Sequence, residues 1–186
     1  NKLDNITLDA YLELEQENKA KYEFHNGTIF AMAGGTVEHG LICGNIHTEI
    51  KIGLRGKASK CTAVNSEVKL HIESSNKYLY PDAMVLCNDI TDSKKGSTAV
   101  INPTVIIEVL SKSTESYDRG DKFFYYREIE SLKEYILINQ YEAQIEIYRR
   151  TSNLWSITRI EGIDEFFELS SLGISIQLKD VYEGVF

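Results

Sequence analysis

Hydrophobic patterns in the first third of the chain predict a helix, a hairpin and a second helix. Residues 7–17 begin with a threonine, a residue type that caps helix N-termini, and carry apolar side chains at helical spacing. Extended apolar segments at 22–25 and 28–33 flank an Asn-Gly dipeptide, which favours a two-residue hairpin turn because both residues tolerate positive φ. Residues 34–54 contain a second capping threonine followed by apolar residues at helical spacing, and they predict a longer helix.

The rest of the chain shows strand patterns around one further helix. Residues 62–72 and 78–87 each read as a single strand, and 103–110 is a short β-branched run typical of central strands. Residues 113–129 predict a helix. Further strands are predicted at 134–139, 144–150 and 155–160. This order of elements indicates an α/β or α+β fold with a mixed sheet. Because no linker or repeat divides the sequence, we expect residues 1–186 to form one domain.

Composition and charge narrow the class of protein. The 186 residues are 42% hydrophobic and 26% charged, and no apolar run is long enough to span a membrane. Residues 1–18 are polar and acidic, unlike a secretory signal. The net charge of -8 disfavours non-specific binding of nucleic acid but permits a local basic groove. Cys43, Cys61 and Cys87 are far apart, which favours reduced thiols in a cytoplasmic protein.

Glu108 is the most unusual residue of the predicted central strand. Ile106 and Leu110 share its face, and Ile107 and Val109 lie on the other. Burying a lone carboxylate is costly unless it is paired or binds a metal. The alternative is a carboxylate that emerges at a strand end and binds a backbone amide or an arginine.

Asp82 heads a second apolar strand directly after Pro81, a residue that tends to stand at a strand start or edge. Taken alone, Asp82 is explained as a turn aspartate that caps the start of the strand, and a Pro-Asp pair is weak evidence for a site. Together with Glu108, it places one acid on each of two strands. Adjacent strands are close enough for two acids to share a divalent ion, and oxygen-only ligands suit Mg²⁺ or Mn²⁺.

Lys122 follows Asp118 by four residues on a predicted helix, so the two side chains share a face. By itself this pair is typical of a weak surface ion pair. Beside Asp82 and Glu108, however, a lysine can orient a water or stabilise the charge that develops on a phosphate.

Several short motifs occur in a fixed order along the chain. They are "YEFHNGTIFAMAGGTVEHG", Pro81-Asp82, Glu108-Val109-Leu110-Ser111, Asp118-x-x-x-Lys122-x-x-x-Tyr126 and "EYILIN". This ordered set, within residues 8–185, resembles the Uma family of endonucleases in the PD-(D/E)XK superfamily. The resemblance implies a restriction endonuclease-like fold, with a central mixed β-sheet flanked by helices.

The resemblance also implies a metal-dependent endonuclease that hydrolyses phosphodiester bonds in DNA. Asp82 and Glu108 would then be the metal-binding acids, holding Mg²⁺ or Mn²⁺. The superfamily lysine usually stands two residues after the second acid, where this chain has Leu110. The family's lysine has moved to the following helix, which maps onto Lys122. Lys112 stands where the family usually has proline and is a rival candidate.

Two residues of the first motif match further family positions. Glu23 would add a metal or supporting contact, and its alternative is an exposed hairpin acid. His39 would have a catalytic role, and its alternative is a packed or capping histidine.

Other functions and partners remain open at this point. An inactive DNA- or partner-binding module on the same fold is favoured by the acidic charge and the missing standard lysine, but intact buried acids argue against it. A metal hydrolase for small phosphates lacks a Gly-rich phosphate cradle or histidine cluster. Strands within 134–160 are candidate edges for a homodimer. One acid-free stretch could contact DNA phosphates, although we favour helix-end cations and a solvated loop. Its cations are Lys51, Arg55, Lys57 and Lys60.

Overall fold

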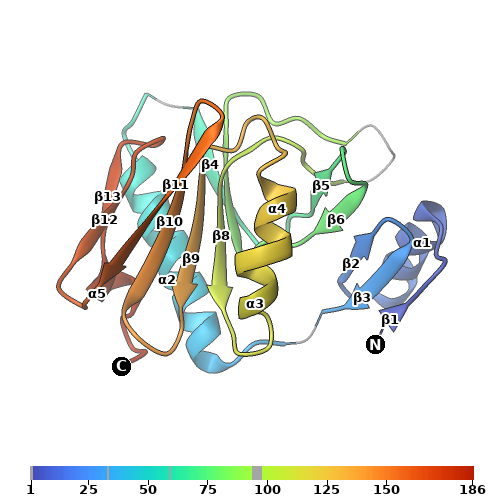
Figure 1. The fold of residues 1–186 in the computed structure, drawn as a ribbon, viewed down its shortest axis with the longest axis horizontal. Helices are drawn as coiled ribbons and strands as arrows, with labels where there is room; N and C mark the ends of the chain where they lie inside the picture. The colour runs from blue at the N-terminus through green and yellow to red at the C-terminus, as the bar shows by residue number, and fades with distance from the viewer. Residues whose placement is uncertain (1, 33, 59, 94–97) are drawn as a thin grey trace.

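A six-stranded mixed sheet forms the centre of the computed structural model, which describes residues 2–32, 34–58, 60–93 and 98–186. Its strands are β4 (Cys61–Asn65), β7 (Ala83–Cys87), β8 (Pro103–Leu110), β9 (Glu134–Asn139), β10 (Gln144–Thr151) and β11 (Leu154–Glu161). They lie in the order β11-β10-β9-β8-β7-β4 (Figure 1). Strands β8 and β9 are parallel, whereas the other neighbouring pairs are antiparallel. The central position predicted for the β8 segment is therefore confirmed.

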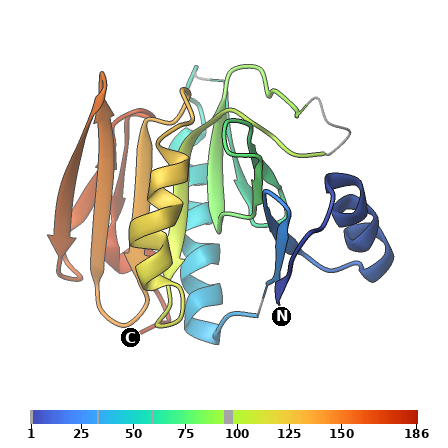
Figure 2. The same ribbon diagram turned by 45° about the vertical axis from the view of Figure 1, so that its right-hand side comes forward.

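Helical layers cover both faces of this sheet (Figures 1 and 2). One face carries α2 (Val37–Leu54), the hairpin of β12 (Phe166–Leu169) and β13 (Ile174–Gln177), and α5 (Leu178–Val181). The other carries α3 (Glu115–Tyr117), a π-helical turn (Asp118–Lys122) and α4 (Phe123–Tyr126). Side chains of β8 alternate between the layers: Ile107 and Val109 pack with α2, whereas Ile106 and Leu110 pack with Tyr126.

A second, antiparallel sheet lies beside the first (Figure 1). Its order is β1-β3-β2-β6-β5, and α1 packs against it. The elements are β1 (Lys2–Leu3), α1 (Leu8–Asn18), β2 (Tyr22–His25), β3 (Thr28–Ala31), β5 (Leu70–Ile72) and β6 (Lys77–Leu79). Tyr11 of α1 stacks on Phe24 of β2, at a centroid separation of 5.1 Å. Because side chains alternate along a strand, Glu23 points to the opposite side from Phe24.

The local signals in the first part of the sequence are confirmed. The Thr7 hydroxyl accepts a hydrogen bond from the backbone amide three residues on, and Thr36 does the same at the start of α2 (both 3.2 Å). Asn26 and Gly27 have φ values of 46° and 102°, as the tight hairpin turn requires. The second hairpin strand, predicted over 28–33, ends at residue 31, and residue 33 lies outside the described residues.

Two segments predicted as single strands each divide between the two sheets. Residues 62–72 form β4 and β5, and 78–87 form β6 and β7. The first break is a turn in which Asn65 Oδ1 accepts a hydrogen bond from the amide of Glu67 (3.1 Å). The second break contains Pro81, which cannot donate to a strand ladder. The second break is hidden in the sequence because the residues on both sides of it, in β6 and β7, are buried apolar residues or lie among them.

The β12–β13 hairpin and α5 are not among the predicted elements. Residues 166–169 and 174–177 nevertheless alternate between buried and exposed side chains. Phe167, Leu169 and Ile176 belong to the cluster under α2. The period-2 signal was therefore present in short segments of four residues.

The prediction of three reduced thiols is wrong for two of the cysteines. Cys61 and Cys87 are direct partners across β4 and β7 and form a disulfide. Cys43 is the free cysteine. Their pairing depends on strand register, which their spacing in the sequence does not reveal. Because two of the three cysteines form a disulfide, free thiols no longer support the expectation of a cytoplasmic protein. Within the described part of the chain, no helix combines the length and apolar character needed to cross a bilayer.

Candidate active site

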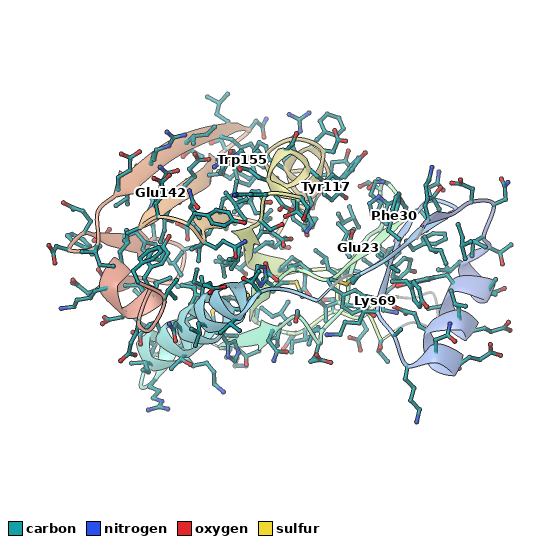
Figure 3. The ribbon with its side chains drawn as sticks, turned by 90° about the horizontal axis from the view of Figure 1, so that it is seen from below. Glu23, Phe30, Lys69, Tyr117, Glu142 and Trp155 are labelled. Atoms are coloured by element: carbon teal, nitrogen blue, oxygen red, sulfur yellow. A yellow bond between two sulfur atoms is a disulfide. The ribbon has the colours of Figure 1, made fainter. Side chains whose placement is uncertain are left out.

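One cavity brings together the five residues singled out from the sequence. It has a volume of about 540 Å³ and is lined by residues of both sheets and of the helical segment after β8. Figure 3 shows Glu23 and Tyr117 approaching it from the second sheet and from α3, respectively. The five predicted residues in its wall are Glu23, His39, Asp82, Glu108 and Lys122. These residues lie up to 99 positions apart in the sequence, and the packing of the two sheets brings them together.

Glu108 and Lys122 form a buried ion pair at the bottom of this cavity. The two side chains are 5% and 8% exposed, and Lys122 Nζ lies 2.8 Å from Glu108 Oε1. The Tyr126 hydroxyl donates a hydrogen bond to the same oxygen (2.7 Å). Burial raises the pKa of Glu108 to about 8, although Lys122 opposes the shift. Glu108 therefore does not emerge at the strand end to bind a backbone amide, which was the alternative.

Lys122 lies among three carboxylates. Its Nζ is 3.2 Å from Asp118 Oδ1 and 4.0 Å from Glu23 Oε1, besides the contact with Glu108. Burial alone would lower the pKa of Lys122, but the attraction of Glu108, Glu23 and Asp118 raises it well above its ordinary value. Lys122 is therefore charged, and its pair with Asp118 is buried rather than a surface ion pair.

The π-helical turn over Asp118–Lys122 places these two residues. The Asp118 carbonyl accepts a hydrogen bond from the Tyr135 hydroxyl (3.0 Å), which ties the turn to β9. Asp118 Oδ1 is buried and faces the Lys122 ammonium at 3.2 Å. Single π-helical turns often occur at functional sites, because they displace side chains from the regular helical positions.

Asp82 lies between β6 and β7, where the chain passes from one sheet to the other. Its Oδ2 accepts a hydrogen bond from the Val109 amide of β8 (2.7 Å) and lies 3.4 Å from His39 Nε2. The aspartate thus makes a backbone contact of the kind expected for a strand-entry residue, while its side chain also faces the cavity. The strand-entry interpretation is therefore supported, and the sharing of a metal ion with Glu108 stays a prediction.

His39 occupies the first turn of α2, with its side chain 20% exposed. The hydrogen bond with Asp82 raises the pKa of His39, against the opposing effect of burial. Nδ1 of the same ring lies 3.5 Å from Cys43 Sγ. His39 is therefore neither enclosed in the core nor a capping side chain, because Thr36 provides the cap.

Glu23 reaches the cavity from β2, with its side chain 13% exposed. His25 Nε2 lies 3.3 Å from Glu23 Oε2. Although burial opposes the change, the contact with His25 and the charge of Lys122 lower the pKa of Glu23. The alternative of an exposed hairpin acid is therefore wrong.

The rival lysine and Gln140 also line the cavity, whereas Tyr126 contacts Glu108 without being among the lining residues. Lys112 is exposed, and its ammonium lies over the Tyr141 ring, 5.3 Å from the centroid. Gln140 accepts a hydrogen bond from the Thr36 hydroxyl (2.9 Å) and donates one to the Leu110 carbonyl (2.8 Å), so it fixes the start of α2 to the end of β8. Sequence patterns showed no signal for Gln140. The contact of Tyr126 with Glu108 was signalled only by its four-residue spacing from Lys122.

The cations of residues 51–60 lie near the opposite end of α2 from His39. Lys51 is in the last turn of α2, and Lys57 donates a hydrogen bond to the Gly173 carbonyl (2.7 Å). At about 1.5 Å per residue, α2 separates this end from the cavity by roughly 20 Å. This placement agrees with the favoured interpretation of helix-end cations.

Comparison with known proteins agrees with the sequence motifs. The model of a protein family, Uma2, described as "Putative restriction endonuclease", matches residues 8–179. The chain belongs to the Uma2 family. Two Synechocystis proteins, the uncharacterized slr1290 and sll1609, are similar to this Uma2 chain. The first is 32% identical over 97% of this chain and 93% of its own length. The second is 31% identical over 91% of this chain and 95% of its own length.

A solved structure supports the fold of this Uma2 chain. It is a crystal structure from Anabaena variabilis described as a "putative nuclease belonging to DUF820", with a TM-score of 0.77 and 18% identity. The match covers 97% of this chain and 99% of that chain. The resemblance to the Uma family is confirmed, as is a mixed central sheet flanked by helices.

Proposed function

We propose that this Uma2 chain, as one domain over residues 1–186, is a metal-dependent endonuclease that hydrolyses phosphodiester bonds in DNA. Mg²⁺ is the proposed ion, with Mn²⁺ as a substitute. The observation that carries the proposal is the convergence of Asp82, Glu108 and Lys122 in one cavity. Membership of the Uma2 family supports the reaction class.

The donor set of the cavity fits a hard divalent cation. Glu23, Asp82, Glu108 and Asp118 offer carboxylate oxygens, the ligands that Mg²⁺ and Mn²⁺ prefer. Among the described residues of the cavity wall, Lys122 is the one buried lysine, whereas Lys112 is exposed and lies over Tyr141, so buried negative charge exceeds buried positive charge. Asp82 and Glu108 would hold the ion, and Glu23 would support them.

Each residue has a defined task in this proposal. A bound divalent ion would polarise the scissile phosphate and lower the pKa of a water. Lys122, held among carboxylates, orients that water or stabilises the charge that grows on the phosphate oxygens. Tyr126 fixes the rotamer of Glu108, and His39 fixes that of Asp82 through their hydrogen-bond distances.

A binding module with an inactive site is the second candidate. It is favoured by one observation: Glu108 is paired with Lys122, and Asp82 lies beside His39. Such pairing partly neutralises the two acids. Glu23 and Asp118 nevertheless add two further carboxylates, which a vestigial site has no physical reason to bury. We therefore rank the nuclease first.

A homodimer would suit a cut through both strands of DNA. Of the described strands within 134–160, β11 alone lies at an edge of the central sheet, since β9 and β10 are interior. Leu154 and Ile157 of β11 are exposed, at 76% and 61%. We propose β11 as the edge where two copies would pair.

Plasmid nicking tests the nuclease proposal. Purified protein is incubated with supercoiled plasmid in Mg²⁺, Mn²⁺ or EDTA, beside Asp82→Ala and Glu108→Gln. Glu17→Gln, at an exposed position of α1, is the matched control for the charge change. Nicking that requires the ion, is lost in both site variants and persists in the control supports the proposal. If the wild type binds no Mn²⁺ in titration calorimetry and cuts no plasmid, the proposal is wrong. Mn²⁺ binding lost in Glu108→Gln, without cleavage of any DNA, supports the binding module.

A further inference from the structure

His39, Cys43 and Asp82 form a second group of metal-binding side chains at the edge of the cavity. His39 and Cys43 stand four residues apart on α2 and so share one face of the helix. Asp82 reaches them from the passage between the two sheets. One donor atom from each of the three residues lies within 4.8 Å of the others. All three side chains are partly exposed, so an ion has access from solvent.

We propose that His39, Cys43 and Asp82 bind a thiophilic divalent cation such as Zn²⁺, and that this ion inhibits the proposed nuclease by taking Asp82. The inhibition rests on the proposed function, because it requires an active nuclease. The binding of the ion rests only on the geometry of the three side chains. The Cys43 proton leaves to solvent when sulfur coordinates the ion, and nothing is oxidised or reduced.

The chemistry of the donors distinguishes this site from the carboxylate site. Thiolate and imidazole are the ligands that Zn²⁺ prefers, whereas Mg²⁺ is held by oxygen. In a tetrahedral zinc site with bonds of about 2.0–2.3 Å, neighbouring donors lie about 3.4–3.7 Å apart. The His39–Asp82 and His39–Cys43 contacts are 3.4 Å and 3.5 Å. The two contacts use different ring nitrogens, Nε2 and Nδ1; with one donor atom from each residue, the three donors lie within 4.8 Å of one another, so the side chains would close by about 1 Å around a tetrahedral ion.

The surroundings leave room for an ion and a water ligand. His39, Cys43 and Asp82 also line a smaller cavity of about 480 Å³, on the side of α2 that carries Gly40. A Cβ atom at Gly40 would meet no atom within 4 Å. A Cβ atom at Gly35 would come within 3.0 Å of His39 Nδ1, so the glycine keeps space beside the imidazole. With three protein donors, the fourth position is open to water, as in zinc sites that exchange their ligands.

Asp82 is the residue that couples the two sites. Its Oδ2 already accepts the Val109 amide and approaches His39, so its side chain has limited freedom to turn. An ion held by His39 and Cys43 draws the same carboxylate away from an ion shared with Glu108. Zn²⁺ and Mg²⁺ therefore compete, even though each has its own preferred donors.

Cobalt absorption tests the binding site without any nuclease assay. Co²⁺ replaces Zn²⁺ in thiolate sites and gives a sulfur-to-cobalt charge-transfer band in the near ultraviolet. Cys61 and Cys87 are joined in a disulfide, so a band of this kind reports Cys43. We expect the band in the wild type and in Glu108→Gln, which removes only the carboxylate site. It should vanish in Cys43→Ala and Cys43→Ser, with Zn²⁺ affinity at least about 100-fold weaker, since even supporting residues contribute 10–100-fold.

Circular dichroism melts of both Cys43 variants show whether they are folded. No cobalt band in the folded wild type would overturn the inference. So would equal Zn²⁺ affinity in the wild type and in a folded Cys43 variant.

Plasmid nicking then tests the inhibitory consequence. Zn²⁺ added at the wild-type dissociation constant, measured at the Mg²⁺ concentration of the assay, should halve Mg²⁺-dependent nicking by the wild type and leave the nicking rate of Cys43→Ala unchanged. Equal inhibition of the two proteins would overturn the competition for Asp82. If neither protein cuts DNA, the proposed function fails, while the cobalt band still decides whether the site binds a thiophilic ion.

Discussion

Replacing Lys122 with methionine removes the one ammonium that the buried acids share. Met has a similar length but no charge, so the change leaves Glu108, Asp118 and Glu23 facing one another. Removing one partner of a buried ion pair lowers the free energy of unfolding by about 3–5 kcal/mol, because the remaining charge is uncompensated. Without Lys122, whose charge lowers the pKa of Glu108, burial raises that pKa further, so Glu108 can take up a proton at neutral pH. We therefore expect Lys122→Met to lower the free energy of unfolding by about 3 kcal/mol at pH 7, the lower end of that range.

Urea denaturation in EDTA and in Mn²⁺ measures this effect and separates its causes. A cation that binds only the folded state stabilises it by about 2.7 kcal/mol at 100 times its dissociation constant. Because Lys122→Met frees the carboxylates, Mn²⁺ should stabilise this variant more than the wild type. Lys112→Met is the matched control: its side chain is exposed, so its unfolding free energy should change by less than about 0.5 kcal/mol.

Two results would refute this reasoning. One is a loss of less than about 1 kcal/mol in EDTA, which would mean that Lys122 does not compensate buried charge. The other is a smaller Mn²⁺ stabilisation in Lys122→Met than in the wild type, which would mean that the acids do not form a cation site. In the double variant with Glu108→Gln, the cost of removing Lys122 should fall by about 1–3 kcal/mol, the usual coupling of contacting residues.

Three further predictions follow from the site and the core. The raised pKa of Glu108 means that the folded state binds more protons than the unfolded state between pH 4.5 and about 8, so the free energy of unfolding in EDTA should fall as the pH rises through that window. Glu108→Gln should flatten this fall. Parallel plots of urea midpoint against pH for the wild type and the variant would contradict the prediction. Tyr126→Phe removes the hydrogen bond to Glu108 and should cost about 1–3 kcal/mol in urea denaturation, whereas no loss would mean that the hydroxyl is satisfied elsewhere. The Cys61–Cys87 disulfide closes a loop with a sequence separation of 26, so replacing both cysteines by serine should cost about 3–4 kcal/mol. The unreduced, denatured wild type should release one titratable thiol, and a count of three would show that the disulfide is absent.

Helices α1 and α2 and the first hairpin could be predicted because their signals are local. A capping threonine bonds an amide three residues away, and an Asn-Gly turn needs only its own two φ angles. Alternation along β8 was also sufficient to place Glu108 on the same face as Ile106 and Leu110, whereas the structure shows that this face is the one opposite α2. These features depend on residues within a few positions of one another.

The candidate site could be predicted only as a set of residues. The family motifs selected Asp82, Glu108 and Lys122, but neither their contacts nor the choice between Lys122 and Lys112 follows from spacing alone. In the structure, Lys122 lies 2.8 Å from Glu108, whereas Lys112 lies over Tyr141. The π-helical turn that sets this contact has no separate hydrophobic pattern.

By itself, then, the sequence determined the local elements, the alternation of the central strand and the family motifs, since each rests on short-range geometry or on residue type and order. Only the tertiary structure decided where the strand patterns break between two sheets, how Cys61 meets Cys87, and which side chains share the cavity. These features depend on strand register and on the packing of layers. The contact of His39 and Cys43, on α2, with Asp82, at the start of β7, likewise depends on how the layers pack. Such contacts form when segments far apart in the chain bury their apolar faces together, and no short-range pattern encodes the distance at which they stop.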